Sequence, residues 1–291
     1  MSIIYCLEES FKEISQLIQF QNSLELSGLQ NTNNCSGDDV KKVDYLSNEI
    51  LKKNLLSCKS IRKIGSEEDD TLIETSFKDA PYLVCFDPLD GSSNIGVNIT
   101  TGTIFGVYAY DEDNKIKSGR NLVMSGYCLY GGCTQFLLNN NEKLSFYQLN
   151  KENKFELLVD DLKIKEKGNT YSLNESNKKL WLNKHYETMI EKCIENNYSS
   201  RWVGSLVADG HRTLINGGFF AYPENSKNKK GKIRLLYEAY PFAHIFKISG
   251  GFASNGYQDL LDVPFPKNIH EKTPIVLCGK YENEIFKHLK N

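Results

Sequence analysis

The chain has 291 residues, of which 40% are apolar and 25% are charged. These values suit a soluble globular protein with a sizeable core. A formal net charge of −2 gives no electrostatic reason to expect nucleic acid or an anionic membrane as a partner. No apolar run approaches the roughly 20 residues of a membrane helix, and the first residues lack the basic segment of a signal peptide.

The eight cysteines make no Cys-x-x-Cys pair, which argues against a zinc site. Several lie in apolar stretches, which favours buried, reduced thiols and a cytoplasmic protein.

Helical spacing of apolar residues predicts helices near residues 7–30 and over 40–56, with a polar loop at 31–39 between them. Pro81–Phe86 is a short apolar run that stops at Asp87-Pro88, and it predicts a buried strand that ends there. Further predicted strands are Thr103–Ala109, Gly126–Tyr130 and Thr134–Leu138.

The chain becomes polar and rich in lysine around residues 150–170, and we expect a subdomain boundary there. The predicted elements that follow are helices near 180–196 and 204–216, a strand at Gly218–Tyr222, a helix at Leu235–Lys247 and a strand at Pro274–Cys278.

Two acidic segments carry chemical information. The run Glu67–Asp70 on its own is typical of a solvated loop. The segment Phe86–Asn94 is more specific, because an apolar strand leads into Asp87 and Asp90 and then into a Gly-Ser-Ser turn. Carboxylates bind hard divalent cations, and consecutive backbone N–H groups of such a turn bind anions such as phosphate. A metal site beside a phosphate site is what phosphoryl hydrolysis requires.

The segment Phe86–Ile95 resembles the signature of the fructose-1,6-bisphosphatase family, within the Li⁺-sensitive sugar phosphatases. The resemblance extends from about Ser36 to the C-terminus. The other matching stretches are Asp44–Asn48, Ser66–Asp69, Gly102–Gly106, Tyr171–Glu175, Gly204–Asp209, Gly231–Glu238 and Ile269-His270.

The resemblance implies an α/β (layered α+β) fold of two subdomains, with alternating helix and sheet layers. Residues 1–160 would bind metal and the 1-phosphate, and residues 161–291 the sugar and the distal phosphate. The implied reaction is the Mg²⁺-dependent hydrolysis of the 1-phosphate of fructose-1,6-bisphosphate to give fructose-6-phosphate.

The resemblance also implies two or three Mg²⁺ ions per active site, with Mn²⁺ able to substitute, and inhibition by Li⁺. The positions that match metal ligands are Glu67, Glu68, Asp87, the backbone carbonyl of Leu89, Asp90 and Glu238. Asp44 matches the residue that activates the attacking water together with Glu68.

Substrate positions follow from the same resemblance. The 1-phosphate is expected on Gly91, Ser92 and Ser93, near Arg234. The sugar is expected to contact Gly204, Ser205, Leu206 and Lys232. The distal phosphate is expected to meet Asn174, Tyr222, Trp202 and Arg201, the last donated by a neighbouring subunit. The protein is therefore expected to be a homodimer or homotetramer, although Arg201 and Lys232 could also be plain surface charges.

Some positions depart from the family pattern in a way that predicts weak or no AMP inhibition of the usual kind. Family members carry an N-terminal arm that binds AMP, and this sequence begins near where that arm should already have ended. A lysine is expected where Pro81 stands, and an arginine is expected at Ala109. Two cations that would pair with the AMP phosphate are therefore missing.

Other departures concern the distal phosphate. A tyrosine is expected shortly after Glu175, but Ser176, Asn177 and Lys178 follow, and Trp202 replaces another tyrosine. The segment from Glu175 to Arg201 is also short, which resembles sedoheptulose-1,7-bisphosphatases. The stretches Tyr171–Glu175 and Val207–Arg212 look more like the fructose enzymes. Fructose-1,6-bisphosphate is the leading substrate, and sedoheptulose-1,7-bisphosphate or activity on both remains the alternative.

Two further hypotheses belong to other classes. An inositol or nucleotide phosphatase would share the Asp-Pro-Leu-Asp-Gly core but not the Tyr171–Glu175 and Lys232–Glu238 context. A catalytically dead relative would be expected to have lost at least one acidic ligand, and all of them are present. His185 and His244 are expected to be structural, and His211-Arg212 to support a subunit interface.

Overall fold

The computed structural model describes residues 2–20, 29–33 and 39–288. The helices are α1 (Ile3–Phe20), α3 (Lys42–Leu55), α4 (His185–Glu195), α5 (Leu206–Asn216), α6 (Tyr240–Ile248) and α7 (Lys280–His288). Short helical turns are η1 (Ser92–Val97), η2 (Gly119–Asn121), η3 (Glu175–Leu180), η4 (Leu235–Ala239) and η5 (Leu260–Asp262).

An eight-stranded sheet, in the order β10-β9-β8-β7-β6-β5-β3-β4, forms the first half of the fold. Its strands in chain order are β3 (Ile61–Ser66), β4 (Ile73–Glu74), β5 (Tyr82–Asp90), β6 (Thr101–Ala109), β7 (Leu122–Tyr130), β8 (Thr134–Asn139), β9 (Leu144–Leu149) and β10 (Phe155–Val159). All pairs are antiparallel except β3 with β5.

A second sheet of five strands, in the order β12-β11-β13-β17-β15, forms the other half. Its strands are β11 (Thr170–Ser172), β12 (Ser199–Ser200), β13 (Phe219–Tyr222), β15 (Phe252–Ser254) and β17 (Ile275–Cys278). Two small ribbons pair β1 (Leu29–Asn33) with β2 (Asp39–Lys41) and β14 (Ile233–Arg234) with β16 (Lys272–Thr273).

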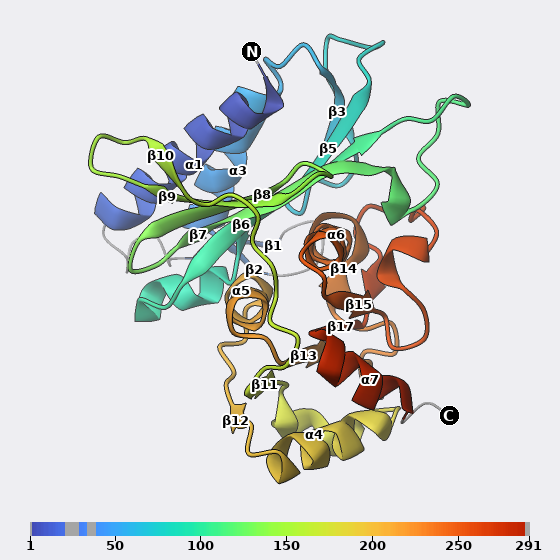
Figure 1. Cartoon of the computed structure of the whole chain (residues 1–291). Helices are drawn as coiled ribbons and strands as arrows, with labels where there is room; N and C mark the ends of the chain where they lie inside the picture. The colour runs from blue at the N-terminus through green and yellow to red at the C-terminus, as the bar shows by residue number, and fades with distance from the viewer. Residues whose placement is uncertain (1, 21–28, 34–38, 289–291) are drawn as a thin grey trace.

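The elements stack as alternating layers (Figure 1). Helices α1 and α3 cover one face of the large sheet, and α5 and α6 fill the space between the two sheets. Helices α4 and α7 lie on the far side of the second sheet. The predicted layered α/β fold is therefore confirmed.

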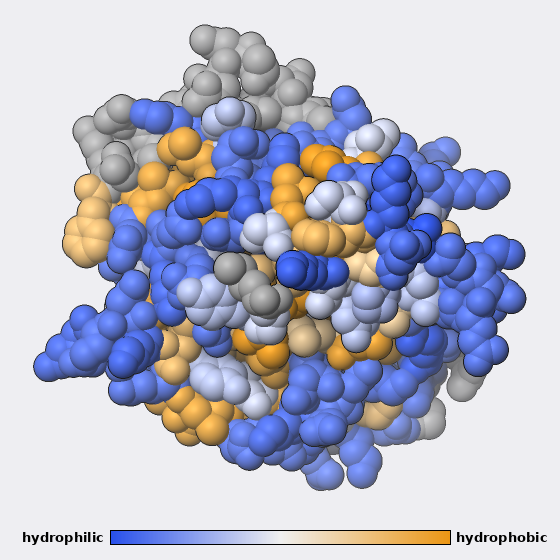
Figure 2. Space-filling model, turned by 90° about the horizontal axis from the view of Figure 1, so that it is seen from above, coloured by the Kyte–Doolittle hydropathy of each residue, from blue (hydrophilic) through white to orange (hydrophobic). Residues whose placement is uncertain are grey.

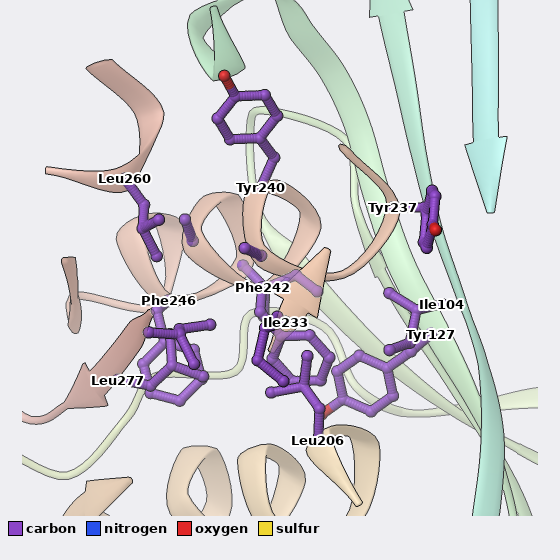
Figure 3. Packing of buried hydrophobic residues seen from close by; sticks show 14 of the residues in the cluster. Ile104, Tyr127, Leu206, Ile233, Tyr237, Tyr240, Phe242, Phe246, Leu260 and Leu277 are labelled. Carbon is purple, nitrogen blue, oxygen red and sulfur yellow. The ribbon is translucent and has the colours of Figure 1, made fainter. Parts of the chain in front are cut away.

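Apolar burial explains why each helix occupies its layer. The buried positions of α1 fall on one face, with Ile3, Leu7, Phe11 and Ile14 at spacings of three and four residues. The central layer is packed by aromatic side chains, as Figure 3 shows for the residues around α6. There the rings of Tyr127 and Phe242 stack with centroids 5.0 Å apart.

Several predicted elements differ in extent. Of the helix predicted near 7–30, residues 7–20 belong to α1, residues 21–28 lie outside the described part of the chain, and Leu29 and Gln30 belong to β1. The predicted loop at 31–39 is strand at its described ends, in β1 and β2, and residues 34–38 are not described. The helix predicted at 40–56 is confirmed as α3. The strand predicted to end at Asp87-Pro88 instead continues to Asp90, because the strand contains a bulge that tolerates the proline.

The predicted helix Leu235–Lys247 is divided. Its first turn, η4, is wide, since the N–H of Tyr240 bonds to the carbonyl of Leu235 five residues earlier. Pro241 at the start of α6 removes a backbone donor, which is consistent with this change of geometry.

The chain leaves the first sheet after β10 and enters the second at β11, so it changes sheets between residues 160 and 169. The division into subdomains at residue 160 stays a prediction.

Among the described residues, no helix combines the length and apolar character needed to cross a bilayer. Seen from the side of α1 and α3, the surface is largely hydrophilic with separate apolar patches (Figure 2).

Candidate active site

Two carboxylates of the signature reach the same face of the large sheet because β5 is bulged. Its register against β6 pairs Asp87 with Ile104 and Asp90 with Gly102, so three steps along β5 oppose two along β6. In a regular strand, residues three apart point to opposite faces. The extra residue of the bulge returns Asp90 to the face of Asp87. The sequence spacing alone does not reveal this.

The third carboxylate comes from the wide turn η4. One oxygen atom from each of three side chains lies within 4.8 Å of the others, and we call these residues the acidic cluster: Asp87, Asp90 and Glu238. The backbone N–H of Arg234 donates to Glu238 Oε2 at 2.5 Å. Oxygen ligands at such spacing suit a hard divalent cation.

Burial dominates the electrostatics of the acidic cluster. It raises the pKa of Asp90 to about 6, although hydrogen bonds from Ser205 and Val207 oppose the rise. It raises the pKa of Glu238 to about 8, against the opposing charge of Arg234. The pKa of Asp87 is raised well above its ordinary value by burial and then by neighbouring carboxylates. A bound cation would compensate this repulsion.

The other predicted acidic residues lie nearby or in the adjoining helix. Glu67 follows β3, and its N–H donates to the carbonyl of Phe86 on β5 at 3.2 Å. Glu67 Oε1 accepts an ion-pair contact from Arg234 Nη2 at 2.8 Å, and its charge is among those that raise the pKa of Asp87. Glu68 comes next in the same loop, where its N–H donates to Ser66 Oγ at 3.2 Å.

Asp44 is 7% exposed in the first turn of α3. Leu89 is buried in the bulge, and its N–H donates to Asp87 Oδ1 at 2.9 Å. The structure therefore brings Asp87, Asp90 and Glu238 together as one group, with Glu67 joined to them through Arg234.

The predicted phosphate turn follows the acidic cluster directly. Gly91 has a φ of 76° and precedes η1, which begins with Ser92 and Ser93. A Cβ atom at Gly91 would lie 2.7 Å from Ser205 Oγ. Glycine is thus required both for the left-handed backbone and for close approach to the start of α5.

The start of α5 is tied to the acidic cluster. Ser205 Oγ donates to Asp90 Oδ2 at 2.6 Å, and the N–H of Val207 donates to the same oxygen at 2.7 Å. A carboxylate is stabilised by a helix N-terminus. Ser205 was predicted to contact the sugar, and in this structure its hydroxyl orients Asp90.

The loop before α5 is held by Asp209 and Arg212, of which Arg212 had been expected, together with His211, to support a subunit interface. Asp209 is fully buried and accepts hydrogen bonds from the N–H groups of Val203, at 3.0 and 3.1 Å, and Gly204, at 2.8 Å. Arg212 pairs with Asp209 and donates to the carbonyl of Arg201 at 3.2 Å. The pair fixes the backbone of the loop that carries several predicted substrate residues.

Two of the predicted distal-phosphate residues, Trp202 and Tyr222, lie in contact with each other. The Trp202 ring stacks on Phe220, with ring centroids 6.3 Å apart, and lies tilted against Tyr222, with centroids 5.8 Å apart. Arg201 is exposed, and its Nη1 donates to the carbonyl of Ser200 at 2.8 Å.

Three more predicted or suggested substrate residues have defined surroundings. Asn174 caps η3 by accepting from the N–H of Ser176. Lys232 is exposed. Lys178, which could replace a missing tyrosine, lies 3.6 Å from Glu187 in an ion pair.

His270 links the two segments that carry predicted acidic ligands, a role that the sequence did not reveal although its motif matched. His270 Nε2 lies 3.0 Å from the carbonyl of Asp69, and Nδ1 lies 2.8 Å from the hydroxyl of Tyr237. A carbonyl only accepts, so Nε2 must carry the proton and Nδ1 accepts from the tyrosine. Burial lowers the pKa of His270, which favours this neutral form.

A carboxylate cluster beside a glycine turn and an arginine is typical of metal-dependent phosphatases. The family model "Fructose-1-6-bisphosphatase, N-terminal domain" matches residues 1–160, and the model for its C-terminal domain matches residues 164–290. The chain belongs to the fructose-1,6-bisphosphatase family.

Individual relatives agree with this assignment. The chain is 40% identical to a class 1 fructose-1,6-bisphosphatase of Sulfurihydrogenibium sp. (strain YO3AOP1), over 99% of this chain and 91% of that protein. It is 39% identical to fructose-1,6-bisphosphatase 1 of Rattus norvegicus, over 97% and 81%.

The fold is similar to crystal structures of Leishmania major fructose-1,6-bisphosphatase. The TM-score is 0.94 for the holo form, with 32% identity over 99% of this chain and 93% of that one. For the apo form the TM-score is 0.88, with 31% identity. Family membership and the acidic cluster together indicate dependence on a divalent metal ion.

We predict that Mg²⁺ raises the melting temperature more at pH 8 than at pH 5. The raised pKa values, about 6 for Asp90 and about 8 for Glu238, favour the protonated folded state at low pH. Without a cation, stability is lost as the pH rises through these values. A cation offsets that loss only where the carboxylates are ionised. Thermal unfolding with and without Mg²⁺ measures the difference, and an equal shift at both pH values would contradict the prediction.

We predict that His270→Ala lowers the melting temperature and weakens Mg²⁺ binding measured by calorimetry. The substitution leaves the Tyr237 hydroxyl without its acceptor, a loss of about 1–3 kcal/mol, and releases the loop at Asp69. His270→Gln, which keeps a donor and an acceptor, should recover part of both effects. His185→Ala, a histidine in the outer layer, is the control. Unchanged Mg²⁺ affinity in His270→Ala would refute the bridging role.

Proposed function

We propose that this protein hydrolyses the 1-phosphate of fructose-1,6-bisphosphate, with Mg²⁺, to give fructose-6-phosphate. The observation that carries the proposal is the placement of the acidic cluster beside the Gly91 turn and Arg234, in a chain that matches both domains of this family. The named relatives are fructose-1,6-bisphosphatases, and the chain covers most of their length. A sugar bisphosphate is therefore the substrate class.

The residues that would hold the metal ions are the acidic cluster, Glu67, Glu68 and the carbonyl of Leu89. Two or three Mg²⁺ ions, or Mn²⁺ in their place, would neutralise the phosphate and lower the pKa of a bound water. Carboxylate and carbonyl oxygens in a largely buried site fit this demand.

Side chains and backbone groups of the chain would bind the 1-phosphate and take up the proton of the attacking water. The Gly91-Ser92-Ser93 turn and the Arg234 guanidinium would orient the 1-phosphate, since a guanidinium binds phosphate oxygens in pairs. Asp44 and Glu68 would take the proton of the attacking water. Water adds to phosphorus, the bond from phosphorus to the sugar oxygen breaks, and that oxygen leaves as the sugar hydroxyl after protonation.

The sugar and distal phosphate are assigned to the loop held by Asp209 and Arg212. Gly204, Ser205, Leu206 and Lys232 would face the sugar, and Asn174, Trp202 and Tyr222 the distal phosphate. Arg201 would act in a neighbouring subunit of a homodimer or homotetramer. Its exposed guanidinium supports this role, because no ion-pair partner lies within 4.0 Å of it in the described part of the chain.

Sedoheptulose-1,7-bisphosphate is the second candidate substrate, and Trp202 is the observation that favours it. The indole of Trp202 packs against Phe220 and Tyr222. It offers one N–H donor at the position where the family pattern has a tyrosine hydroxyl. A different donor position could suit a longer sugar.

The seven described cysteines form no disulfide, which supports a cytoplasmic location.

We predict Mg²⁺-dependent phosphate release with kcat/KM at least about tenfold higher for the six-carbon than for the seven-carbon bisphosphate. Trp202→Tyr should change this ratio, and Trp181→Tyr, a control in another layer, should not. A preference for the seven-carbon sugar would replace the substrate assignment. No turnover with Mg²⁺ or Mn²⁺ would refute the enzyme proposal, and turnover of inositol monophosphate alone would move the protein to another class.

We also propose that AMP does not inhibit this enzyme in the usual way. Strand register pairs Tyr82 with Ala109, so Pro81 and Ala109 mark one place on neighbouring strands. Neither residue carries the charge that an AMP phosphate would need there.

The expected result is full activity in the presence of micromolar AMP. The double variant Pro81→Lys/Ala109→Arg should gain AMP binding in calorimetry, and each single variant should gain less. Strong inhibition of the unmodified protein by AMP would overturn the proposal.

A further inference from the structure

A cavity lies away from the acidic cluster, with none of Asp87, Asp90 and Glu238 in its walls. It has a volume of about 730 Å³ and is bounded by α6, β15, β17 and α7, elements that are neighbours at the C-terminal side of Figure 1. Its apolar walls include Phe252, Val276 and Phe286. A volume of this size and aromatic walls are typical of small-molecule sites.

Among the described residues, Lys247 is the cation of this cavity that has no ion-pair partner, whereas Lys287, which also lines it, lies 3.8 Å from Glu284. Arg120 lines it, but its guanidinium is bound to Asp259 at 3.0 Å and to Asp262 at 2.8 Å. Lys247 also lines the cavity and is exposed. Within the described ranges, no carboxylate oxygen lies within 4.0 Å of the Lys247 ammonium group.

A second polar group in the wall points to the same kind of ligand. Asn283 on α7 is 8% exposed and lines the cavity, and its Nδ2 has no hydrogen-bond partner. A buried amide without a partner costs about 1–3 kcal/mol, so such groups are usually satisfied. An oxygen atom of a ligand would satisfy this donor.

Lys247 stands between this cavity and a smaller one of about 310 Å³. Both cavities are lined by Lys247 and Arg120, and the smaller one also by His244 and Leu261. A negatively charged group at Lys247 could therefore be combined with an apolar body in the larger cavity.

We propose that the larger cavity binds a small organic anion, with a flat apolar body on Phe252, Val276 and Phe286 and its charged group on Lys247. The proposal does not depend on the hydrolase activity. It places the ligand against α6, which follows η4 directly and so continues the segment that carries Glu238.

The probe for the test is 8-anilinonaphthalene-1-sulfonate, which joins flat rings to one sulfonate and fluoresces when its rings are shielded from water. Titration of the protein should show saturable binding of about one probe per chain. Lys247→Glu should weaken the affinity about tenfold or more, equivalent to about 1.4 kcal/mol. Ala253→Trp, which fills the cavity, should abolish binding.

The matched control is Lys151→Glu, an equal charge reversal at an exposed turn between β9 and β10, and it should bind like the unmodified protein. Lys247→Gln gives a milder change if the reversal disturbs folding, and unchanged melting temperatures show that the variants are folded. Absence of saturable binding, or equal binding by the Lys247 and Ala253 variants, would overturn the proposal.

Discussion

The site depends on holding several carboxylates together in a place that water barely reaches. The bulge in β5 is the feature that makes this possible, because it turns Asp90 onto the face already occupied by Asp87. Glu238 then approaches from the wide turn η4. Repulsion and burial both oppose ionisation in this arrangement, and the raised pKa values express that cost.

The surrounding structure offsets this cost with a few directed contacts. Arg234 provides a guanidinium to Glu67 and a backbone N–H to Glu238. The first turn of α5 provides two donors to Asp90. Since α5 lies between the two sheets, the contacts that orient Asp90 also fix the central helical layer against the large sheet. The same contacts therefore set both the geometry of the site and the stacking of the layers.

Sequence patterns predicted the strongly periodic elements and failed for short or charged ones. Helix α3 followed from its apolar spacing, whereas β3 contains Arg62 and Lys63 and was not predicted. Strand β10 is largely exposed and lies in the polar, lysine-rich stretch where we expected a subdomain boundary and predicted no strand. It forms because it pairs with β9, the strand before it in the chain, and so extends the large sheet by one strand. Such pairing depends on tertiary contacts that local propensity does not contain.

The sequence by itself determined the family, the layered fold class and the identity of the acidic residues, because spacing and residue type are local properties of the chain. Tertiary structure decided which of those residues meet and what else holds them. The hydroxyl of Ser205 orients Asp90, and Asp209 fixes the loop before α5. His270 bridges two segments far apart in the chain. The physical reason is that these hydrogen bonds depend on distance and direction in space, which are set only when bulge, turn and helix ends pack together.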